Sequence, residues 1–562
     1  MSTATKEIEK SSSDASHEKF PVNANLQRNP EQHFDVASID LVQRRLKQRH
    51  IQMIAIAGTL GTGLFLGSGR ALSGAGPVGA LLAYTFMGSI AYSTLCSLGE
   101  MTCYAPISGS FPHFAARWVD PALGFAVRFR TACRTGVPVE ITGAQLLITY
   151  WDNNANGLEK VRAVISLGRI QSRPFAAEFI FALIKLSLIT GLILVGLVID
   201  LGGAPNRERL GFQYWKNPGV LNGAGLEPKH IGLDRFLGIL SVLVQAGFSF
   251  GGMEFVAVSA SETENPRRNI PKAIRRVFYR ICIFYILGIF VTGLIVPFND
   301  PDLLQSTGTA AQSPYVIAMT RASIKVLPSI INAGVMTSAF SSSNSILFCT
   351  SRILYGLALR GQAPRFFAHC TSSGLPITAI AFTSAFAFLS LMNLSSGAAT
   401  VFNWLVNLTT LSGLLTWSAI NLTYLFFYRG FKAQGMDRKE RLHYRSPLQA
   451  SILYSDVNRE FVIPSLNHQP GLAIWGLTWC TTIVLINGFE VFWNFTASGF
   501  LTGYINIPIF FGLYAFWKVV KKTKIWRPEE MDFVTGIPTL EQTEEPEIPP
   551  TTFWEKVTAV LF

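Results

Sequence analysis

Apolar runs of about twenty residues, each long enough to cross the core of a bilayer as a helix, recur along most of this chain of 562 residues. Hydrophobic residues make up 49% of the chain and charged residues only 15%. A large soluble enzyme is excluded, because it would need far more polar surface. The sequence predicts an all-α polytopic membrane protein with spans at about 51–72, 78–102, 136–151, 178–200, 236–260, 279–297, 326–348, 375–394, 400–428, 471–489 and 498–518.

The distribution of charge predicts the orientation of the chain. Lys and Arg gather in the loops at 262–280 and 429–445 and after the last span, and basic loops face the cytosol. The first 50 residues are polar, lack the apolar core of a signal peptide, and carry four basic residues beside the first span. Both termini are therefore expected in the cytosol. The net charge of +12 reflects this topology, and no Arg/aromatic stripe indicates nucleic-acid binding.

One crossing is missing from this scheme. Three spans from a cytosolic N-terminus end outside, whereas the span at 178–200 must start inside, so a further crossing is required between about 152 and 177. That stretch carries Arg162, Arg169 and Arg173, and each would cost roughly 2.5–3.5 kcal/mol near the middle of a bilayer. No normal span fits there, and the basic stretch VRFRTACR at 127–134 disrupts the start of the third span.

The first span contains an unusual concentration of glycine. Its stretch IAIAGTLGTGLFLGSG, at 54–69, accepts several glycines, although each costs about 1 kcal/mol relative to Ala inside a helix. Gly63 and Gly67 form a GxxxG pattern that favours close helix packing. A broken helix is the alternative, and FSFGGME at 248–254 interrupts a second span with paired glycines. GTLGTG is not a nucleotide-binding loop, because no strand precedes it and no Lys follows at the required place.

Several segments together resemble the fungal amino acid permeases of the amino acid–polyamine–organocation superfamily. The most distinctive is AGFSFGGMEFVAVSASETENPRRNIPKAI; others are SLGEMTCYAPISGSF, PVEITGAQLLITYW, SRILYGLALRGQAP, FNWLVNLTTLSG and KKTKIWRPEEMDFVTGIP. The resemblance covers roughly 45–540 and implies twelve spans in a LeuT-like fold, a five-plus-five inverted repeat followed by two helices. The chain departs from the pattern at about 127–135 and 157–177, the start of span three and all of span four, and 450–469 resembles an insertion. Mis-joined coding sequence and a degenerate paralogue are the two explanations.

The resemblance implies that spans one and six are each broken near the middle of the membrane. Backbone groups released by a break are tolerated only where they line a cavity and find partners. N–H groups at the start of the second half-helix would bind the carboxylate of an amino acid, and carbonyls of the first half-helix would bind its ammonium. Helix packing is the alternative for these glycines. The predicted substrate-binding residues are Ile56, Ala57, Thr59, Gly61, Thr62, Gly63, Phe248, Ser249, Phe250, Gly251 and Glu254.

Charged residues within the spans are the candidates for proton coupling, because an intramembrane charge is costly and usually functional. Glu254 is expected to sense the substrate ammonium or to carry a proton, with a protonated packing residue as the alternative. Related permeases place a Lys at the position of Lys185, where sodium-coupled relatives hold their ion, so Lys185 is expected to couple transport to protons; its alternative is snorkelling to the cytosolic face. Glu140 is expected to pair with Lys185 or a polar residue, and Glu100 is as readily structural. The eighth segment adds a polar patch, which serves an ion site or helix contacts: Ser338, Ser341, Ser342, Ser343 and Asn344.

These features predict a secondary, proton-coupled amino acid importer of a fungal plasma membrane that works by alternating access. The sequence shows no nucleophile triad, metal cluster or ATP motif, so we expect neither an enzyme nor a metal or other cofactor, and the seven cysteines show no metal or disulfide spacing. Because few charged residues are available for a substrate side chain, a broad preference for neutral amino acids is expected. The alternatives are a non-transporting amino acid sensor and an inactive product, because residues 127–177 lack a normal span.

The expected organisation has three parts: a disordered cytosolic tail at 1–50, a transmembrane permease domain at 51–520, and a cytosolic tail at 521–562. The expected partners are the amino acid substrate, protons and membrane lipid. The two tails are candidate binding sites for cytosolic trafficking or ubiquitination machinery.

Overall fold

The computed structural model describes residues 46, 48–133, 135–148, 150–151, 174–304, 313–359, 361–371, 375–393, 398–446 and 470–544, which all belong to the compact unit 40–562. Within these ranges the chain is helical, and its one β interaction is an isolated parallel bridge between Leu46 and Thr263. The predicted all-α architecture is therefore confirmed. Of the expected N-terminal tail at 1–50, Leu46 pairs with Thr263 and α2 begins at Gln48. The rest of that tail, the arginines of the missing crossing and the expected insertion at 450–469 lie outside the described residues.

The helices have the following bounds. The first half contains α2 (Gln48–Thr59), α3 (Thr62–Tyr104), α4 (Ser110–Trp118), α5 (Pro121–Ala132), α6 (Gly136–Ile148), α8 (Pro174–Asp200), α9 (Gln213–Lys216), α10 (Ile231–Phe250), α11 (Phe255–Val258), η2 (Ser259–Glu262) and α12 (Pro266–Ile295). The second half contains α13 (Pro301–Leu304), α14 (Pro314–Arg321), α15 (Leu327–Leu359), η4 (Arg365–Ala368), α16 (Ile377–Ala385), η5 (Phe386–Met392), α18 (Ala398–Ala433) and α19 (Arg438–Arg441). The C-terminal part contains α20 (Gly471–Ile486), η6 (Phe489–Phe492), α21 (Ala497–Tyr504), α22 (Asn506–Lys521), η7 (Pro528–Glu530) and α23 (Leu540–Thr543).

Several helices are long and apolar enough to cross a membrane. In the described ranges they are Thr62–Tyr104, Phe179–Asp200, Ile231–Glu262, Pro266–Ile295 and Gly471–Phe492, and α21 with α22 adds a sixth that is bent by 44°. The other predicted spans also fall on helices, namely α6, α15, α16 with η5, and α18. These helices are shorter or carry more polar residues; α15, for example, contains the serine patch.

The first two predicted spans are joined differently from the expectation. No loop separates them, because α3 continues from the end of the first span through the whole of the second. The helix changes direction at Gly76, whose φ of +74° is a left-handed conformation that favours glycine, and at the following Pro77. A β-carbon on Gly76 would also lie 2.8 Å from the backbone N of Asn222, so the loop at 201–230 packs tightly against this kink.

The third predicted span begins at its expected residue, and the basic stretch before it belongs largely to a separate helix. Helix α5 ends at Ala132 and α6 begins at Gly136. The two arginines of α5 that were expected to disrupt this region have polar partners: Arg128 hydrogen-bonds to Gln362 and lies 3.3 Å from a ring nitrogen of His113, and Arg130 hydrogen-bonds to Asn506 of α22. The interior of the protein thus accommodates these charges, because a buried charge is tolerated where it is hydrogen-bonded.

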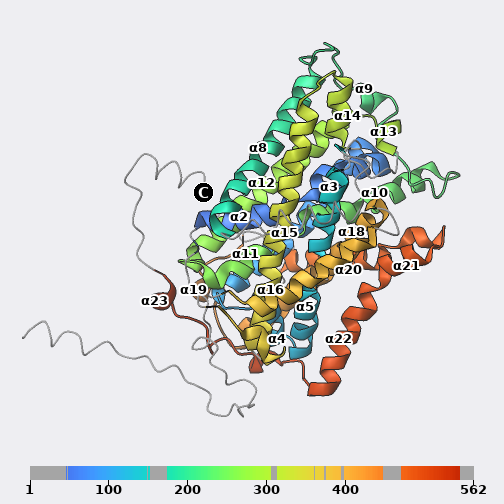
Figure 1. Cartoon of the computed structure of the whole chain (residues 1–562). Helices are drawn as coiled ribbons and strands as arrows, with labels where there is room; N and C mark the ends of the chain where they lie inside the picture. Colours follow the sequence, from blue (N-terminus) through green and yellow to red (C-terminus); the bar gives the residue numbers. More distant parts are fainter. Residues whose placement is uncertain are drawn as a thin grey trace, which may run out of the picture. The chain divides into compact units, whose positions relative to one another are not determined.

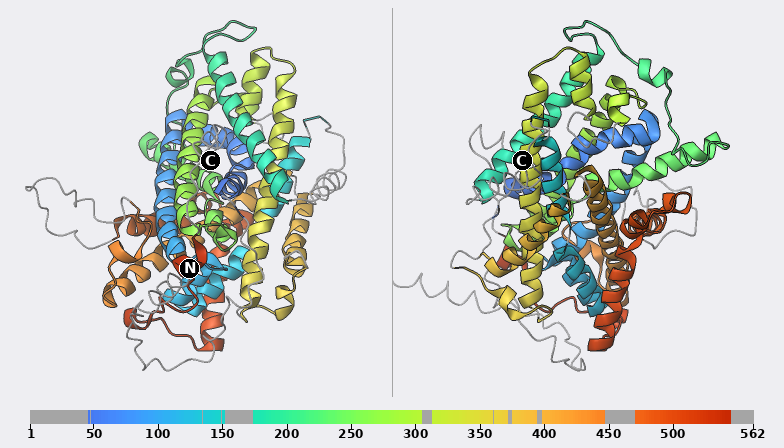
Figure 2. Two further views of the ribbon diagram at one scale, coloured as in Figure 1. Left: turned by 90° about the vertical axis from the view of Figure 1, so that its left-hand side faces the viewer. Right: turned by 45° about the vertical axis from the view of Figure 1, so that its right-hand side comes forward.

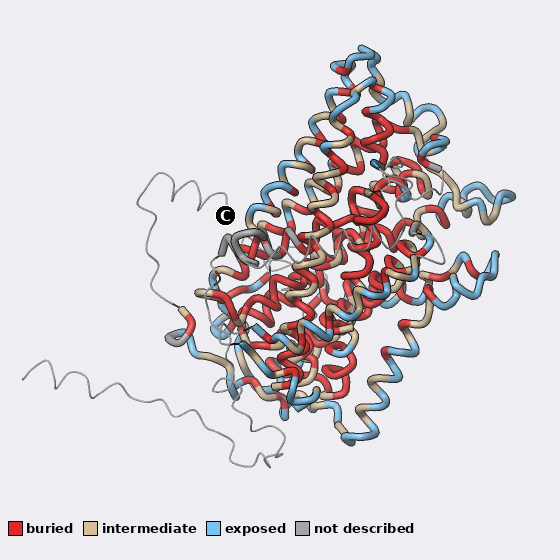
Figure 3. Tube along the Cα trace, viewed as in Figure 1, coloured by how far each residue is buried: buried red, intermediate tan, exposed pale blue. Residues whose placement is uncertain are grey.

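The helix breaks are surrounded by the longest helices. Helix α2 packs against α8, α11, α12 and α15, and α3 packs against α10 and α12. Figure 1 shows α8, α12 and α15 running alongside one another, and the right-hand view of Figure 2 places α21 and α22, in red, at the edge of the bundle. Buried residues follow the inner helices, whereas α22 is largely exposed (Figure 3). Its exposed side chains include Phe511, Phe516 and Val519, and such apolar residues are suited to contact with lipid.

Candidate substrate-binding site

The first break separates α2 from α3 at Leu60 and Gly61, where the glycine-rich stretch predicts it. Polar side chains from other helices hold the carbonyl groups that the break releases. The Ser338 hydroxyl donates to the Leu60 carbonyl at 2.9 Å, and the Ser342 hydroxyl lies 3.4 Å from the Gly58 carbonyl. The Tyr285 hydroxyl lies 3.0 Å from the Thr59 carbonyl. Part of the predicted serine patch therefore supports the first break.

Glu140 occupies the N-terminal end of the second half-helix. Its Oε2 accepts the backbone N–H of Thr62, the first residue of α3, at 3.2 Å, and its Oε1 accepts the Ser342 hydroxyl at 3.1 Å. The positive end of a helix dipole favours a carboxylate at this place. Lys185 of α8 is buried and interacts electrostatically with Glu140. Of the two expected kinds of partner for Glu140, Ser342 is a polar residue that hydrogen-bonds to it, and Lys185 interacts with it electrostatically.

The second break separates α10 from α11 at residues 251–254. Gly252 has a φ of +101°, which an L-residue with a side chain rarely adopts. The carboxylate of Glu254 turns back onto the break: its Oε2 accepts the N–H of Gly252 at 3.1 Å and the indole N–H of Trp417, from α18, at 3.2 Å. Both of these partners are donors, so the carboxylate fastens the backbone of its own break to α18.

The two breaks lie in direct contact. A β-carbon on Gly252 would lie 2.8 Å from the carbonyl oxygen of Gly58, and a β-carbon on Gly58 would lie 2.9 Å from the ring of Phe255. Tyr285 contacts both breaks, because its hydroxyl also lies 2.6 Å from the Ser249 carbonyl. Small residues at these positions allow the two backbones to approach each other.

A cavity lies between the breaks. Glycines from both breaks line it together with residues of α6, α15 and α18: Gly58, Thr59, Gly61, Gly63, Gly136, Glu140, Phe248, Gly251, Gly252, Phe255, Ile346 and Thr409. Glu140 is its one charged lining residue among those that the structure describes. The cavity therefore offers a carboxylate and backbone polar groups in an otherwise uncharged surrounding.

A second, smaller cavity adjoins the first. It is lined by Gly247, Phe248, Gly251, Thr410, Gly413, Leu414 and Trp417. Phe248 and Gly251 line both cavities, so these two residues form part of the boundary between them. This lining contains no charged residue.

The predicted site residues fall into two groups. Thr59, Gly61, Gly63, Phe248, Gly251 and Glu140 line the first cavity, whereas Ile56, Thr62, Ser249, Phe250, Lys185 and Glu254 are buried around it. Phe250 packs against the rings of Tyr84 and Tyr285, and Ser249 lies 3.1 Å from the Tyr84 hydroxyl. The remaining predicted residue, Ala57, lies in α2.

Two predicted residues have contacts that differ from the expectation. The Ile56 carbonyl was expected to be free for an ammonium group, but it accepts the N–H of Leu60 at 2.9 Å, because the first half-helix continues for longer than expected. Gly61 N–H bonds to the Thr59 carbonyl instead of continuing the helical pattern. Side chains from other helices instead hold the carbonyls of Gly58, Thr59 and Leu60. Glu254, expected beside the substrate, lines neither cavity and instead binds its own break.

Glu100 has a structural environment. It is fully buried, and it bonds to Arg438 at 2.6 Å, to the Tyr424 hydroxyl at 2.5 Å and to the backbone N–H of Ser446 at 2.7 Å. These contacts fasten the segment after α18 to the end of α3, which supports the structural alternative for Glu100.

Sequence reasoning missed several residues of the site. Tyr285 holds both breaks, Trp417 binds Glu254, and Phe255 lies against Gly58. Each is an aromatic residue within an apolar span, where nothing in the sequence pattern separates it from a residue that faces lipid or the core.

Known proteins resemble this chain in sequence and in fold. The family model for amino acid permeases matches residues 50–457. The dicarboxylic amino acid permease of Saccharomyces cerevisiae is 38% identical over 518 residues, which cover 90% of this chain and 81% of that protein. The lysine-specific permease of Saccharomyces cerevisiae is 35% identical, with 92% and 83% covered, and the proline-specific permease of Emericella nidulans is 38% identical, with 88% of each covered. The fold resembles the crystal structure of the manganese transporter of Eremococcus coleocola, with a TM-score of 0.52 and 12% identity over 84% of this chain and 94% of that one.

Proposed function

Because this chain belongs to the amino acid permease family, we propose that it imports amino acids across the plasma membrane by proton-coupled alternating access, with both termini in the cytosol. Family membership makes it a transporter of amino acids across a membrane, and not an enzyme. We propose in addition that transport is coupled to protons, that it is directed inward, and that it takes place at the plasma membrane. The residues that form the site are also part of the proposal.

The position of Glu140 carries the proposal. Its carboxylate accepts the Thr62 N–H at the N-terminal end of α3, which is where the carboxylate of an amino acid would bind. The carboxylates of Glu140 and of the substrate would therefore compete for the Thr62 N–H. A proton on Glu140 removes its charge and frees the Thr62 N–H for the substrate carboxylate. Loss of that proton to the cytosol returns Glu140 to Thr62 and expels the substrate.

Lys185 provides the second part of the coupling. Its ammonium interacts with Glu140 from α8, in a region where both groups are buried. When Glu140 takes up a proton, the ammonium loses its anionic partner, and a bound substrate carboxylate replaces that charge. Proton and substrate then bind together, which is the requirement for symport.

The same cavity suggests the class of substrate. The substrate ammonium would bind carbonyl groups of the breaks, of which that of Gly58 lies at their contact. The substrate side chain would extend past Phe248 into the second cavity, whose lining is uncharged. We therefore propose a preference for neutral amino acids. The names of the relatives do not decide which amino acid is carried. The dicarboxylic, the lysine-specific and the proline-specific permease have nearly the same sequence identity to this chain.

Uptake of radiolabelled neutral amino acids under an imposed pH gradient tests the function. The wild-type chain should accumulate substrate only when the outside is more acidic, and Lys185→Met should bind substrate but lose the dependence on the gradient. Retained proton-driven accumulation by Lys185→Met would rule out the coupling role of Lys185. Binding without uptake by the wild-type chain would favour the sensor, and an N-terminus accessible to protease from outside would favour an inactive product.

A further inference from the structure

Two distinctive sequence motifs have no part in the substrate cavity. One is the segment ETENPRRNIP that follows the second break, and the other is IWRPEEMDFVTGIP near the C-terminus. The structure brings them together. We name residues 526–544 the C-terminal clasp.

Arg267, in the first turn of α12, anchors the distal end of the clasp. Its guanidinium donates to the Pro538 carbonyl at 2.6 Å and to the Thr543 hydroxyl at 3.0 Å, and its backbone N–H donates to the carboxylate of Glu544 at 2.8 Å. The side chain is 8% exposed and also reaches the carbonyl of Cys103, near the end of α3. A buried arginine with this set of acceptors is held in one geometry.

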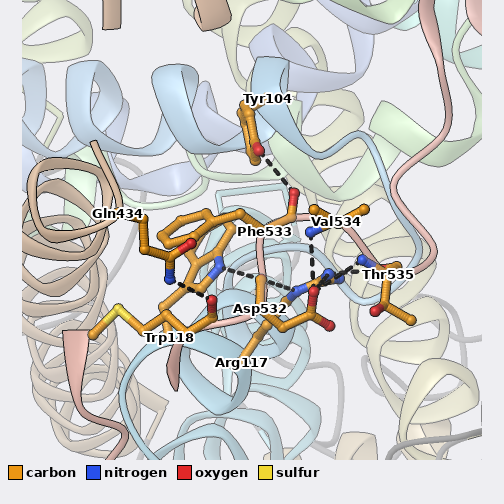
Figure 4. A network of polar contacts seen from close by, with 9 residues as sticks. Tyr104, Arg117, Trp118, Gln434, Asp532, Phe533, Val534 and Thr535 are labelled. Carbon is orange, nitrogen blue, oxygen red and sulfur yellow. Dashed lines mark hydrogen bonds and ion pairs between the residues drawn. The ribbon is translucent and has the colours of Figure 1, made fainter. Parts of the chain in front are cut away.

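Arg117 and Trp118, at the end of α4, anchor the proximal end (Figure 4). Arg117 donates to the Asp532 carbonyl at 2.6 Å and forms a 3.0 Å ion pair with its carboxylate, and the Trp118 indole donates to the same carbonyl at 3.1 Å. The Asp532 carboxylate also accepts the N–H groups of Val534 and Thr535, each at 2.9 Å, which fixes the local turn.

The middle of the clasp is buried against the ends of α3 and α18. Met531 and Phe533 are each 3% exposed, and both would collide with a β-carbon on Gly430 of α18. The Tyr104 hydroxyl donates to the Phe533 carbonyl at 2.8 Å, and the Gln434 amide donates to the Met531 carbonyl at 2.8 Å (Figure 4). The clasp therefore joins α3, α4, α12 and α18.

The backbone beside Arg267 is also connected to the first half-helix. Leu46, just before α2, donates to the Glu262 carbonyl at 2.8 Å and accepts the Glu264 N–H at 2.9 Å. The chain that leads into the first break and the chain that leaves the second break are thus tied together. Through Arg267, the clasp fastens this pair to α4 and α18.

We propose that the C-terminal clasp is an autoinhibitory contact, which must loosen before the substrate cavity can open to the cytosol. In the alternating access proposed above, the half-helices of the two breaks would move relative to α18. The clasp bridges these parts, so it adds its contact energy to the closed state and shifts the population away from the open one. The inference rests on the proposed orientation of the chain, but it does not depend on which amino acid is carried.

Thiol labelling from the cytosolic side tests the clasp. Thr59→Cys places a reporter in the wall of the cavity, and a membrane-impermeant maleimide applied to inside-out vesicles measures cytosolic access, with the labelled site located by mass spectrometry. Adding Asp532→Ala removes the ion pair and the local turn. We expect labelling to become roughly three- to ten-fold faster, as for the loss of one ion pair and two hydrogen bonds on a partly exposed segment.

Glu529→Ala is the matched control. It also replaces an acidic residue of the clasp by Ala, but the Glu529 bond that the structure shows uses the backbone carbonyl, which the variant keeps. Labelling of this control should match that of the reporter alone. Trp118→Phe, which removes one donor and keeps the ring, provides a second test should Asp532→Ala fail to reach the membrane.

The outcomes are distinct. Faster labelling in Asp532→Ala or Trp118→Phe, but not in Glu529→Ala, supports the clasp. Equal labelling in all variants overturns it, and equal acceleration by Glu529→Ala shows a general effect of charge instead of a clasp. Labelling needs no transported substrate, so a chain that takes up no amino acid still gives a result, and failure of the proposed function is recognised separately in the uptake assay.

Discussion

The backbone of Gly252 lies directly against the carbonyl oxygen of Gly58, so closely that a β-carbon on Gly252 would come within 2.8 Å of that oxygen. The two residues belong to two different broken helices, and their contact brings the released backbone groups of both breaks to one cavity.

Gly252→Ala tests this contact. The variant must place a side chain at a φ of +101° and against a backbone oxygen that cannot move aside. Strain of this kind costs about 1–3 kcal/mol, so we expect uptake to fall by roughly tenfold or more. Uptake is measured per molecule in the membrane. Gly191→Ala is the control, because a β-carbon there meets nothing within 4 Å; equal uptake by both variants would contradict a role for the contact.

Glu140→Gln tests the proton site. The neutral amide resembles protonated Glu140, which leaves the Thr62 N–H available to the substrate carboxylate, but it cannot gain or lose a proton. Substrate should therefore still bind, while accumulation no longer follows the pH gradient. Ser342→Ala is the comparison, since it keeps the Glu140 carboxylate and removes a hydroxyl that donates to it, a bond worth about 1.5–3 kcal/mol, and that also lies 3.4 Å from the Gly58 carbonyl. It should keep gradient-driven uptake at a lower rate. Gradient dependence in Glu140→Gln would exclude Glu140 as the proton carrier.

Glu254→Gln and Trp417→Phe test how the second break is held. Glu254→Gln should abolish uptake while the protein stays in the membrane, because the neutral amide binds the Gly252 N–H and the Trp417 indole less strongly. Trp417→Phe keeps an aromatic ring and removes one donor, which we expect to cost about 1.5–3 kcal/mol. Its uptake should therefore fall between those of the wild type and Glu254→Gln. Normal uptake by Glu254→Gln would remove this residue from the mechanism.

Phe248→Ala tests the division between the two cavities. Phe248 lines both of them, so removal of its ring should join them and admit larger neutral side chains. We expect phenylalanine and leucine to compete several-fold better against labelled glycine than they do in the wild type, as for about 1 kcal/mol gained in a hydrophobic pocket. The rate of glycine uptake itself serves as the internal control. An unchanged order of competitors would show that the second cavity does not receive the substrate side chain.

The resemblance to permeases predicts the breaks well, and the glycines, which by themselves are also compatible with helix packing, mark their positions. The residue at which each half-helix ends is predicted less well. The Ile56 carbonyl was expected to be free, yet it closes a further turn of α2. Whether one more backbone hydrogen bond forms depends on the side chains that are available to hold the next carbonyls. Those of Ser338, Ser342 and Tyr285 come from α12 and α15, far away in the sequence.

The role of Glu254 shows the same limit. The sequence shows that a carboxylate in an apolar span is exceptional, but it does not show toward which residues the side chain points. Glu254 faces Trp417 and the backbone of its own break, whereas Glu140, from another helix, takes the place in the cavity. The arginines of α5 give a second example, because they were expected to disrupt a span and instead bind Gln362 and Asn506.

The sequence by itself therefore determined the helical membrane class, the two helix breaks and the charged residues around them, because hydropathy and glycine content act locally along the chain. Only the tertiary structure decided which of these groups meet: Glu140 with Thr62, Glu254 with Trp417, and Arg267 with the C-terminal clasp. Each is a contact between segments far apart in sequence, and its geometry depends on the packing of whole helices, which no local pattern of residues encodes.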